Sequence, residues 1–390
     1  MTASIPALIG QSVHAIDTPA LVVDMDAMES NLQTMAAFAA QHQVRLRPHA
    51  KMHKSAELAK LQMAAGAVGV CVQKTAEAEA LVAGGVHNIF ISNEVIAPTK
   101  LARIATLTRV LAPLAGKLAI CVDSLEGIKR LASSMDAGCL ATGVASSIDV
   151  FIELNVGQNR CGVEPGEAAV ALALEIGKHP ALNFAGLQAY QGKAQHMRSA
   201  SERSGAIFNA IDAVRRTREL IEGAGIKVAL VTGAGTGTAP LEAASKLYGE
   251  LQAGSYLFMD ADYAANEPAV GQPCFKHALF VKTQIISVQD GHVVCDAGHK
   301  SHAIDSGLPH VHTFSSDSAL EYSNGGDEHG ILKPAPGCAR LPSLGSMLWL
   351  IPGHCDPTVN LHDAMIGVRG GLQSGVVERI IAVDGRGALT

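Results

Sequence analysis

The feature that most constrains the fold of this chain is a regular alternation of short apolar runs with amphipathic stretches, over about two-thirds of its 390 residues. The apolar runs, such as Asn88–Ile91, are continuous, which is typical of strands buried on both faces of a parallel sheet. In residues 27–42 the apolar side chains recur at helical spacing, as in Met28, Leu32 and Met35. The strand candidates of this series are Ala20–Asp24, Val44–Leu46, Gly69–Val72, Asn88–Ile91, Leu118–Val122, Asp149–Leu154, Phe184–Ala189 and Lys227–Val231.

This alternation predicts an α/β fold with a parallel sheet. About eight strand–helix units lie between Leu21 and Phe258, which fits a (β/α)8 TIM barrel; a doubly wound open sheet is the alternative. After about residue 265 the helical periodicity fades, and strand-like runs separated by Gly-rich turns predict a second, mostly β domain. We therefore expect the barrel to span residues 20–264 and the β domain to take residues 1–19 and 265–390.

The composition excludes several classes of protein. The 36 acidic and 30 basic residues give a net charge of −6, which argues against a nucleic-acid partner. Hydrophobic residues make up 48% and charged residues 17%, so the chain is not disordered, and no apolar run is long enough to predict a membrane span. The N-terminus does not have the pattern of a signal peptide, and the eight cysteines form no Cys-x-x-Cys pair, which predicts reduced thiols and a cytoplasmic protein.

A basic segment follows the second predicted strand, with Lys51 between His49 and His53 and with Lys54 close by. In a barrel, catalytic side chains come from the C-terminal ends of the strands. Cationic neighbours lower the pKa of an ammonium group, which is what a lysine nucleophile needs. The alternative is a basic surface patch beside the start of a helix.

Two glycine-containing loops follow later predicted strands. The loop Thr232–Thr238 holds three glycines at a spacing of two residues, and its backbone N–H groups and threonine hydroxyls suit a phosphate group. It lacks the lysine of a P-loop and the spacing of a Rossmann loop. Gly254-Ser255 would supply the other half of a phosphate site. The alternative for both loops is a tight turn with no ligand.

Two further segments carry candidate ligands. Arg160 lies in a Gly-rich turn after a predicted strand, where it either reaches into a site or is a surface arginine. His354 and Asp356 follow the predicted strand Met347–Ile351, and if the extended geometry continues their side chains point the same way. Nitrogen and oxygen ligands suit a divalent metal, with water or substrate completing the coordination. The alternative for this segment is a structural turn, and Cys355 would point away.

In chain order, five of these segments together resemble one known family: Pro48–Lys54, Gln188–Gly192, Gly233–Gly237, Gly254–Tyr256 and Pro352–Thr358. From Asp17 to Val383 the chain is similar to the D-threonine aldolase / D-serine dehydratase family of pyridoxal-phosphate enzymes. Within that family it is most similar to members that act on 3-hydroxy-D-aspartate. The resemblance implies the alanine-racemase fold, a pyridoxal-phosphate-binding (β/α)8 TIM barrel with a C-terminal mostly β domain.

The resemblance also implies roles for individual residues. Lys51 would be the catalytic lysine that holds pyridoxal 5'-phosphate covalently. His354 and Asp356 would bind Mg²⁺ or Mn²⁺, because Asp356 is a hard oxygen ligand where dehydratase members tend to have cysteine and bind zinc. The remaining cofactor contacts would be Gln73, Arg160 at the pyridine nitrogen, Tyr190 at the ring, and Gly235, Thr236, Gly254 and Ser255 at the phosphate.

The implied activity is that of a carbon–carbon lyase that cleaves 3-hydroxy-D-aspartate to glycine and glyoxylate by retro-aldol chemistry, as a homodimer. The alternatives are a D-threonine aldolase, a D-serine or 3-hydroxy-D-aspartate dehydratase, an amino-acid racemase and a non-catalytic carrier of the cofactor. The base stays open between a metal-bound hydroxide, His49 and His53. Lys74 and Lys300 are the available cations for the distal carboxylate of the substrate.

Overall fold

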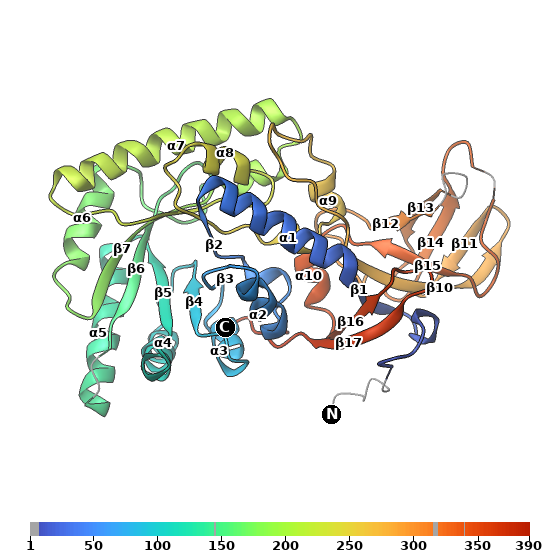
Figure 1. Cartoon of the computed structure of the whole chain (residues 1–390), viewed down its shortest axis with the longest axis horizontal. Helices are drawn as coiled ribbons and strands as arrows, with labels where there is room; N and C mark the ends of the chain where they lie inside the picture. The colour runs from blue at the N-terminus through green and yellow to red at the C-terminus, as the bar shows by residue number, and fades with distance from the viewer. Residues whose placement is uncertain (1–7, 144–145, 315–318, 339) are drawn as a thin grey trace.

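Two sheets organise the computed structural model, which describes residues 8–143, 146–314, 319–338 and 340–390. Figure 1 shows the helix-covered sheet on the left and a second, strand-rich domain on the right. The first sheet has eight parallel strands in the order β2-β9-β8-β7-β6-β5-β4-β3. These strands are β2 (Arg45–Leu46), β3 (Val70–Val72), β4 (Asn88–Ile91), β5 (Lys117–Val122), β6 (Ile148–Glu153), β7 (Leu182–Ala189), β8 (Val231–Gly233) and β9 (Glu250–Leu251).

The two end strands of this sheet meet, which closes it into a barrel. The N–H of Val68 donates to Leu46 O at 2.9 Å and the N–H of Cys71 donates to Pro48 O at 2.8 Å. His49 and Cys71 form a parallel bridge at the same place. The barrel prediction is therefore confirmed, and the doubly wound open sheet is excluded.

Helices cover the outside of the barrel sheet (Figure 1), and all of them except α1 follow a barrel strand. In α1 the predicted apolar face, with Met28, Leu32, Met35 and Phe38, is buried. The Asp24 carboxylate caps this helix by accepting the N–H of Ala27 at 3.0 Å. The helices are α1 (Met25–His42), α2 (Ala56–Ala64), α3 (Thr75–Ala83), α4 (Pro98–Leu111), α5 (Leu125–Thr142), α6 (Glu167–Ile176), α7 (Ala200–Gly223), α8 (Ala239–Ala244) and α9 (Ala261–Ala264). Short 3₁₀ turns are η1 (Val13–Ala15), η2 (Ala50–Met52), η3 (Ala112–Leu114), η4 (Gly192–His196) and η5 (Ser255–Leu257).

The second sheet contains the run that was predicted as the first barrel strand. β1 (Ala20–Asp24) pairs antiparallel with β10 (Leu279–Gln289) and parallel with β16 (Ala364–Arg369). Placing residues 20–24 in the barrel was therefore wrong. A short apolar run that is buried on both faces has the same pattern in either sheet, so the sequence does not distinguish the two.

The second domain is mostly β, as predicted, and its described residues form nine strands of one sheet. The predicted runs became β10, β11, β15 and β17. The structure adds β12, β13, β14 and β16. The apolar patterns of these four strands are weak in the sequence. Besides β1, β10 and β16, the strands are β11 (His292–Cys295), β12 (His310–His312), β13 (Leu320–Asn324), β14 (Gly330–Pro334), β15 (Met347–Ile351) and β17 (Val376–Ala382), with the short helix α10 (Cys355–Val359) after β15.

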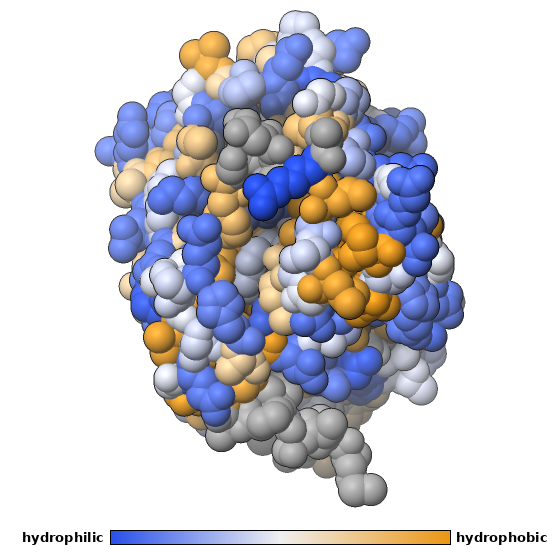
Figure 2. Space-filling view, turned by 90° about the vertical axis from the view of Figure 1, so that its right-hand side faces the viewer, coloured by the Kyte–Doolittle hydropathy of each residue, from blue (hydrophilic) through white to orange (hydrophobic). Residues whose placement is uncertain are grey.

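The outer face of the β domain carries apolar side chains. Figure 2 looks onto this end of the molecule and shows them gathered in a patch. Exposed apolar residues of this domain include Ile286, Val288 and Phe314. Within the described residues, no helix has the length and apolar character needed to cross a membrane, and the cysteines are free thiols. The homodimer and the cytoplasmic location stay predictions.

A buried lysine ties the N-terminal segment to the β domain. Lys282, on β10, is 1% exposed. Its ammonium group donates to the carbonyl oxygens of Val13, His14 and Ile16 at 3.0, 3.3 and 2.6 Å. These bonds satisfy three backbone acceptors with one cation, which offsets the cost of burying its charge.

Lys282→Met should lower the free energy of unfolding by about 2–4 kcal/mol, because buried carbonyl groups lose their donor. Chemical denaturation followed by tryptophan fluorescence measures this, since the single tryptophan, Trp349, lies on β15 with its ring 6.4 Å from that of Phe280 on β10. The exposed Lys333→Met is the matched control and should shift the midpoint little. Equal midpoints for the two variants would contradict the role of Lys282.

Candidate active site

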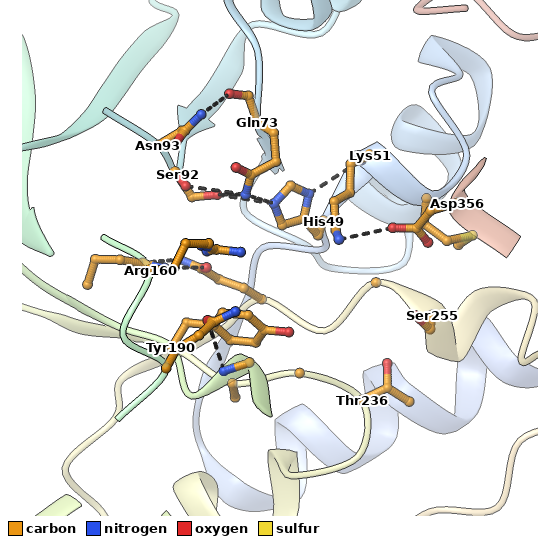
Figure 3. Close-up of a pocket in the computed structure, with 18 of the residues that line it drawn as sticks. His49, Lys51, Gln73, Ser92, Asn93, Arg160, Tyr190, Thr236, Ser255 and Asp356 are labelled. Atoms are coloured by element: carbon orange, nitrogen blue, oxygen red, sulfur yellow. Dashed lines mark hydrogen bonds and ion pairs between the residues drawn. The ribbon is translucent and has the colours of Figure 1, made fainter. Parts of the chain in front are cut away.

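A cavity of about 440 Å³ opens at the C-terminal ends of the barrel strands, where the β domain meets the barrel. The structure brings all ten sequence-predicted site residues to its wall, although they come from segments far apart in the chain. They are Lys51, Gln73, Arg160, Tyr190, Gly235, Thr236, Gly254, Ser255, His354 and Asp356. Figure 3 shows Arg160 and Tyr190 on one side, with Thr236 and Ser255 near one another and Lys51 facing Asp356.

Lys51 lies in η2, directly after β2, and its Nζ is 3.0 Å from Asp356 Oδ2. The Asp356 carboxylate raises the pKa of Lys51 above its ordinary value. The prediction that cationic neighbours lower this pKa is therefore wrong for the structure described. Burial keeps His49 and His53 neutral, lowering the pKa of His53 to about 4, and Lys54 is paired with Glu77 at 3.1 Å.

His49 is buried in a hydrogen-bond network at the edge of the cavity (Figure 3). Its Nε2 lies 3.1 Å from Ser92 Oγ and 3.0 Å from Gln73 Nε2, and its Nδ1 is 3.4 Å from the backbone N of Lys51. Gln73 thus contacts His49, and through it the turn that carries Lys51. This network fixes the position of the lysine rather than leaving His49 free to exchange protons.

His53 is removed from the cavity. It is completely buried, its Nδ1 accepts the N–H of Ser55 at 3.0 Å, and its Nε2 lies 3.2 Å from Gln62 Oε1. Both ring nitrogens are therefore engaged away from the wall that Lys51 lines. The structure gives no support to His53 as a base.

Arg160 reaches the cavity from a loop that a bridge between Leu154 and Val163 closes. Gly162, at a φ of 99°, takes a backbone conformation that favours glycine, and its N–H donates to Asp123 Oδ2 at 3.2 Å. Behind this loop, burial and the nearby Glu94 raise the pKa of Glu153 to about 8. Glu153 therefore holds a proton at neutral pH.

Two backbone N–H groups of the glycine loop after β8 form hydrogen bonds within the chain. The N–H of Gly235 donates to Thr238 Oγ1 at 3.3 Å, and the N–H of Gly237 donates to Gln195 Oε1 at 3.0 Å. These two amides are thus already engaged within the chain. A Cβ on Gly254 would lie 2.8 Å from the carbonyl oxygen of His49, so this position requires glycine, and a Cβ on Gly235 would displace the side chain of Gln195, which would lie 2.4 Å from it.

The hydroxyl groups of Thr236 and Ser255 lie near one another at the end of the cavity that the two glycine loops form (Figure 3). The Thr236 hydroxyl accepts the N–H of Tyr256 at 3.0 Å, which joins the two loops. Polar groups on backbone loops after late barrel strands suit a phosphate group. The phosphate-binding role of Gly235, Thr236, Gly254 and Ser255 stays a prediction.

His354 and Asp356 converge, but not through the extended geometry that the sequence suggested. His354 is the N-cap residue of α10, and Asp356 lies in the first turn of that helix. His354 Nε2 is 3.8 Å from Asp356 Oδ1. The helix starts there because the buried Asp260 accepts the N–H of Cys355 at 3.1 Å, and Cys355 itself is buried in the core.

This pair fits the predicted divalent cation. Asp356 Oδ1 is buried without a hydrogen-bond partner among the described residues. Such an orphaned carboxylate oxygen, with an imidazole nitrogen beside it, is a donor set that accepts a cation. The described residues contain no group of three or more His, Cys, Asp or Glu side chains that could hold a metal. A cation here would complete its coordination with water or substrate.

The sequence reasoning missed a third histidine of the cavity, besides His49 and His354. His196 ends the η4 turn that follows β7, and its Nδ1 lies 2.7 Å from Asp262 Oδ2 on α9. Asp262 is nearly buried and also pairs with Arg198. Ser92 and Asn93, after β4, were missed as well. The signal that could have found them is their position just after barrel strands, because side chains there face the mouth of the barrel.

Comparisons with known proteins agree with this architecture. Residues 23–262 match the family model "Alanine racemase, N-terminal domain", and residues 278–368 match "Putative serine dehydratase domain". The chain is 42% identical over 383 residues to a D-threonine aldolase of Arthrobacter sp., covering 98% of this chain and 96% of that protein. It is 39% identical over 389 residues to a 3-hydroxy-D-aspartate aldolase of Paracoccus denitrificans, covering 98% and 95%.

A solved structure is similar over nearly its whole length. The crystal structure of D-threonine aldolase from Filomicrobium marinum superposes with a TM-score of 0.92 at 44% identity, covering 99% of this chain and 100% of that one. The similarity therefore extends through both the barrel and the β domain.

Glu153→Gln should make stability less sensitive to pH. The native state holds a proton on Glu153 up to a pKa of about 8, whereas the unfolded chain releases it near the ordinary value of 4.5. The wild type should therefore lose stability relative to the variant as pH rises from 4.5 to about 8, by up to about 1.4 kcal/mol per pH unit, and no further above that. Denaturation of both proteins at pH 5 and pH 8.5 measures this, and an equal difference at the two pH values would contradict the assignment.

Proposed function

We propose a function from the premise that this chain belongs to the alanine-racemase-like family of pyridoxal-phosphate enzymes: it is a D-3-hydroxyamino acid aldolase that cleaves 3-hydroxy-D-aspartate to glycine and glyoxylate. The observation that carries the proposal is the meeting of Lys51 from the barrel with Asp356 from the β domain, 3.0 Å apart in one cavity. A lysine amine and a cation-binding carboxylate on the same cavity wall suit cleavage next to a hydroxyl-bearing carbon.

Lys51 is the proposed attachment point of the cofactor. Pyridoxal phosphate, when bound, supplies an electron sink for the charge left on the α-carbon after cleavage. The turn η2 and the bonds of His49 to Ser92 and Gln73 hold the lysine at the cavity wall. Arg160 and Tyr190 lie together on another side (Figure 3), where they would orient the ring, and Thr236 and Ser255 would hold the phosphate.

His354 and Asp356 would hold the divalent cation, Mg²⁺ or Mn²⁺, because a carboxylate oxygen is a hard ligand. A divalent cation lowers the pKa of an oxygen atom that it binds. The unpartnered Oδ1 of Asp356 supports this assignment. The aspartate at this position, where dehydratase members tend to have cysteine, favours the aldolase over the dehydratase alternative.

His196 is the proposed base that takes the proton of the substrate's β-hydroxyl. Asp262 lies 2.7 Å from Nδ1, and Nε2 has no hydrogen bond among the described residues. The side chain is 52% exposed, so it exchanges protons with solvent more readily than the buried His49. An imidazole oriented by a carboxylate is a common arrangement for proton transfer near neutral pH.

The charges of the cavity support a dicarboxylate substrate. Lys74 lines the cavity, and neither its ammonium group nor the Arg160 guanidinium forms an ion pair with a carboxylate among the described residues. Lys300, the other cation considered, is paired with Asp327 and Glu328 at 3.2 and 2.8 Å and lies off the cavity wall. Lys74 is therefore the proposed partner of the distal carboxylate.

D-threonine is the second candidate substrate. It carries a methyl group where 3-hydroxyaspartate has its second carboxylate. The 42% identical relative and the superposed structure are both named D-threonine aldolases, and the apolar side chain of Met52 lines the cavity.

The purified holoenzyme should produce glycine faster from 3-hydroxy-D-aspartate than from D-threonine, with the matching aldehyde as coproduct and no release of ammonia. EDTA should suppress cleavage while the visible absorbance of the cofactor stays, and Mg²⁺ or Mn²⁺ should restore activity. Lys51→Ala, the negative control, should lose both the absorbance and the activity.

Two outcomes would count against the proposal. Ammonia and a keto acid in place of glycine would identify a dehydratase, and faster cleavage of D-threonine would move the substrate to the second candidate. Full activity in EDTA would remove the cation from the site.

Lys74→Met should separate the two substrates. We expect kcat/KM for 3-hydroxy-D-aspartate to fall roughly 10- to 100-fold, because a hydrogen bond between charged groups is lost, while kcat/KM for D-threonine changes less than about threefold. Lys300→Met is the matched control and should leave both substrates unaffected. An equal fall for both substrates would show that Lys74 acts on the fold of the site and not on the distal carboxylate.

A further inference from the structure

The far side of the His354 ring is held by a carboxylate that neither the sequence motif nor the proposed reaction includes. Asp305 lies in the loop between β11 and β12, and its Oδ2 is 2.7 Å from His354 Nδ1. The hydroxyl of Ser306 donates to the same carboxylate oxygen at 3.0 Å and lies 3.3 Å from the same ring nitrogen. The other ring nitrogen, Nε2, faces Asp356.

Hydrogen bonds and close backbone packing join the loop that carries Asp305 to the loop that carries His354. Thr358 Oγ1 accepts the N–H of Ala303 at 3.0 Å and donates to the carbonyl oxygen of His354 at 2.7 Å. A Cβ on Gly353 would lie 2.2 Å from the carbonyl oxygen of Gly307, so the two backbones touch where residue 353 is glycine. The contact between Asp305 and His354 is therefore built into the packing of the two loops.

This contact decides which nitrogen of His354 is available. A neutral imidazole carries one N–H, and the nitrogen without the hydrogen is the one that binds a cation. Because the Asp305 carboxylate can only accept, the hydrogen is placed on Nδ1. The lone pair then lies on Nε2, the nitrogen that faces Asp356. Carboxylates that orient metal-binding histidines in this way raise their affinity for the metal.

We propose that Asp305 is a positioning residue for the divalent cation: it holds His354 with its Nε2 lone pair toward Asp356. The proposal rests on the proposed cation site at His354 and Asp356. Asp305 touches neither substrate nor cofactor, and its effect passes through the orientation and tautomer of one imidazole ring. The alternative is a surface ion pair, since the Asp305 side chain is 52% exposed. In that case the loss of Asp305 would leave the cation affinity unchanged.

The test measures cation affinity directly, without turnover. Mn²⁺ binding to chelator-treated holoenzyme is followed by electron paramagnetic resonance for the wild type, Asp305→Ala, Asp305→Asn and His354→Ala. Asp305→Ala should weaken Mn²⁺ binding roughly 10- to 100-fold. Asp305→Asn should retain part of the affinity, because the amide oxygen still accepts the Nδ1–H but carries no charge.

The matched control is Asp327→Asn, an exposed acid of the same domain that pairs with Lys300 and His299 and lies off the cavity. It should bind Mn²⁺ within twofold of the wild type. Thermal unfolding and the visible absorbance of the bound cofactor show whether each variant is folded, and if Asp305→Ala is not, the decision passes to Asp305→Asn.

Mn²⁺ affinity within twofold of the wild type in a folded Asp305 variant overturns the proposal while leaving the cation site intact. A His354→Ala variant that binds Mn²⁺ as tightly as the wild type, or a wild type that binds none, overturns the cation site and this proposal with it. These results therefore distinguish a failure of the positioning role from a failure of the site.

Discussion

The candidate site depends on the docking of one β-domain loop against the last helical turn of the barrel. The N–H groups of Ala261 and Asp262 donate to the carbonyl oxygens of Pro352 and Gly353, and the buried Asp260 accepts the N–H of Cys355. Through these bonds the residues that end the barrel also set the position of α10. They hold α10 of the β domain against the barrel domain, where Asp356 lies 3.0 Å from Lys51.

Much of the fold could be predicted from the sequence, because strands buried on both faces leave continuous apolar runs. The barrel and the change to β structure after about residue 265 were predicted on that basis, and the structure confirms both. The placement of Ala20–Asp24 in the barrel was wrong, since burial on both faces is the same signal in either sheet. Weakly patterned strands such as β12 and β13 gave no clear signal, because their side chains are half exposed.

Of the candidate site, the sequence predicted which residues gather and missed how they act on one another. Residues that directly follow strands converge at the mouth of the barrel, which is why Lys51 and Arg160 reached one cavity. The pKa of Lys51 was predicted in the wrong direction. Burial keeps His49 and His53 neutral, and the Asp356 carboxylate of the other domain raises the pKa of Lys51. The contacts of His196 with Asp262 and of His354 with Asp305 join separate segments, and a single sequence carries no sign of such pairings.

Because the site is divided between two domains, its residues are synthesised at different times. Lys51 leaves the ribosome about 300 residues before Asp356, which corresponds to roughly 15 to 60 s of synthesis. The barrel strands are complete by residue 251, so the nascent chain can close the barrel while its lysine still lacks its counter-ion. The contacts of the turn after Lys51 are completed later still, because Ala56 and Lys54 form hydrogen bonds with Asp384 and Gly385, near the C-terminal end of the sequence. A truncated chain with a finished barrel therefore has an unfinished site, because His354 and Asp356 are synthesised only with the β domain.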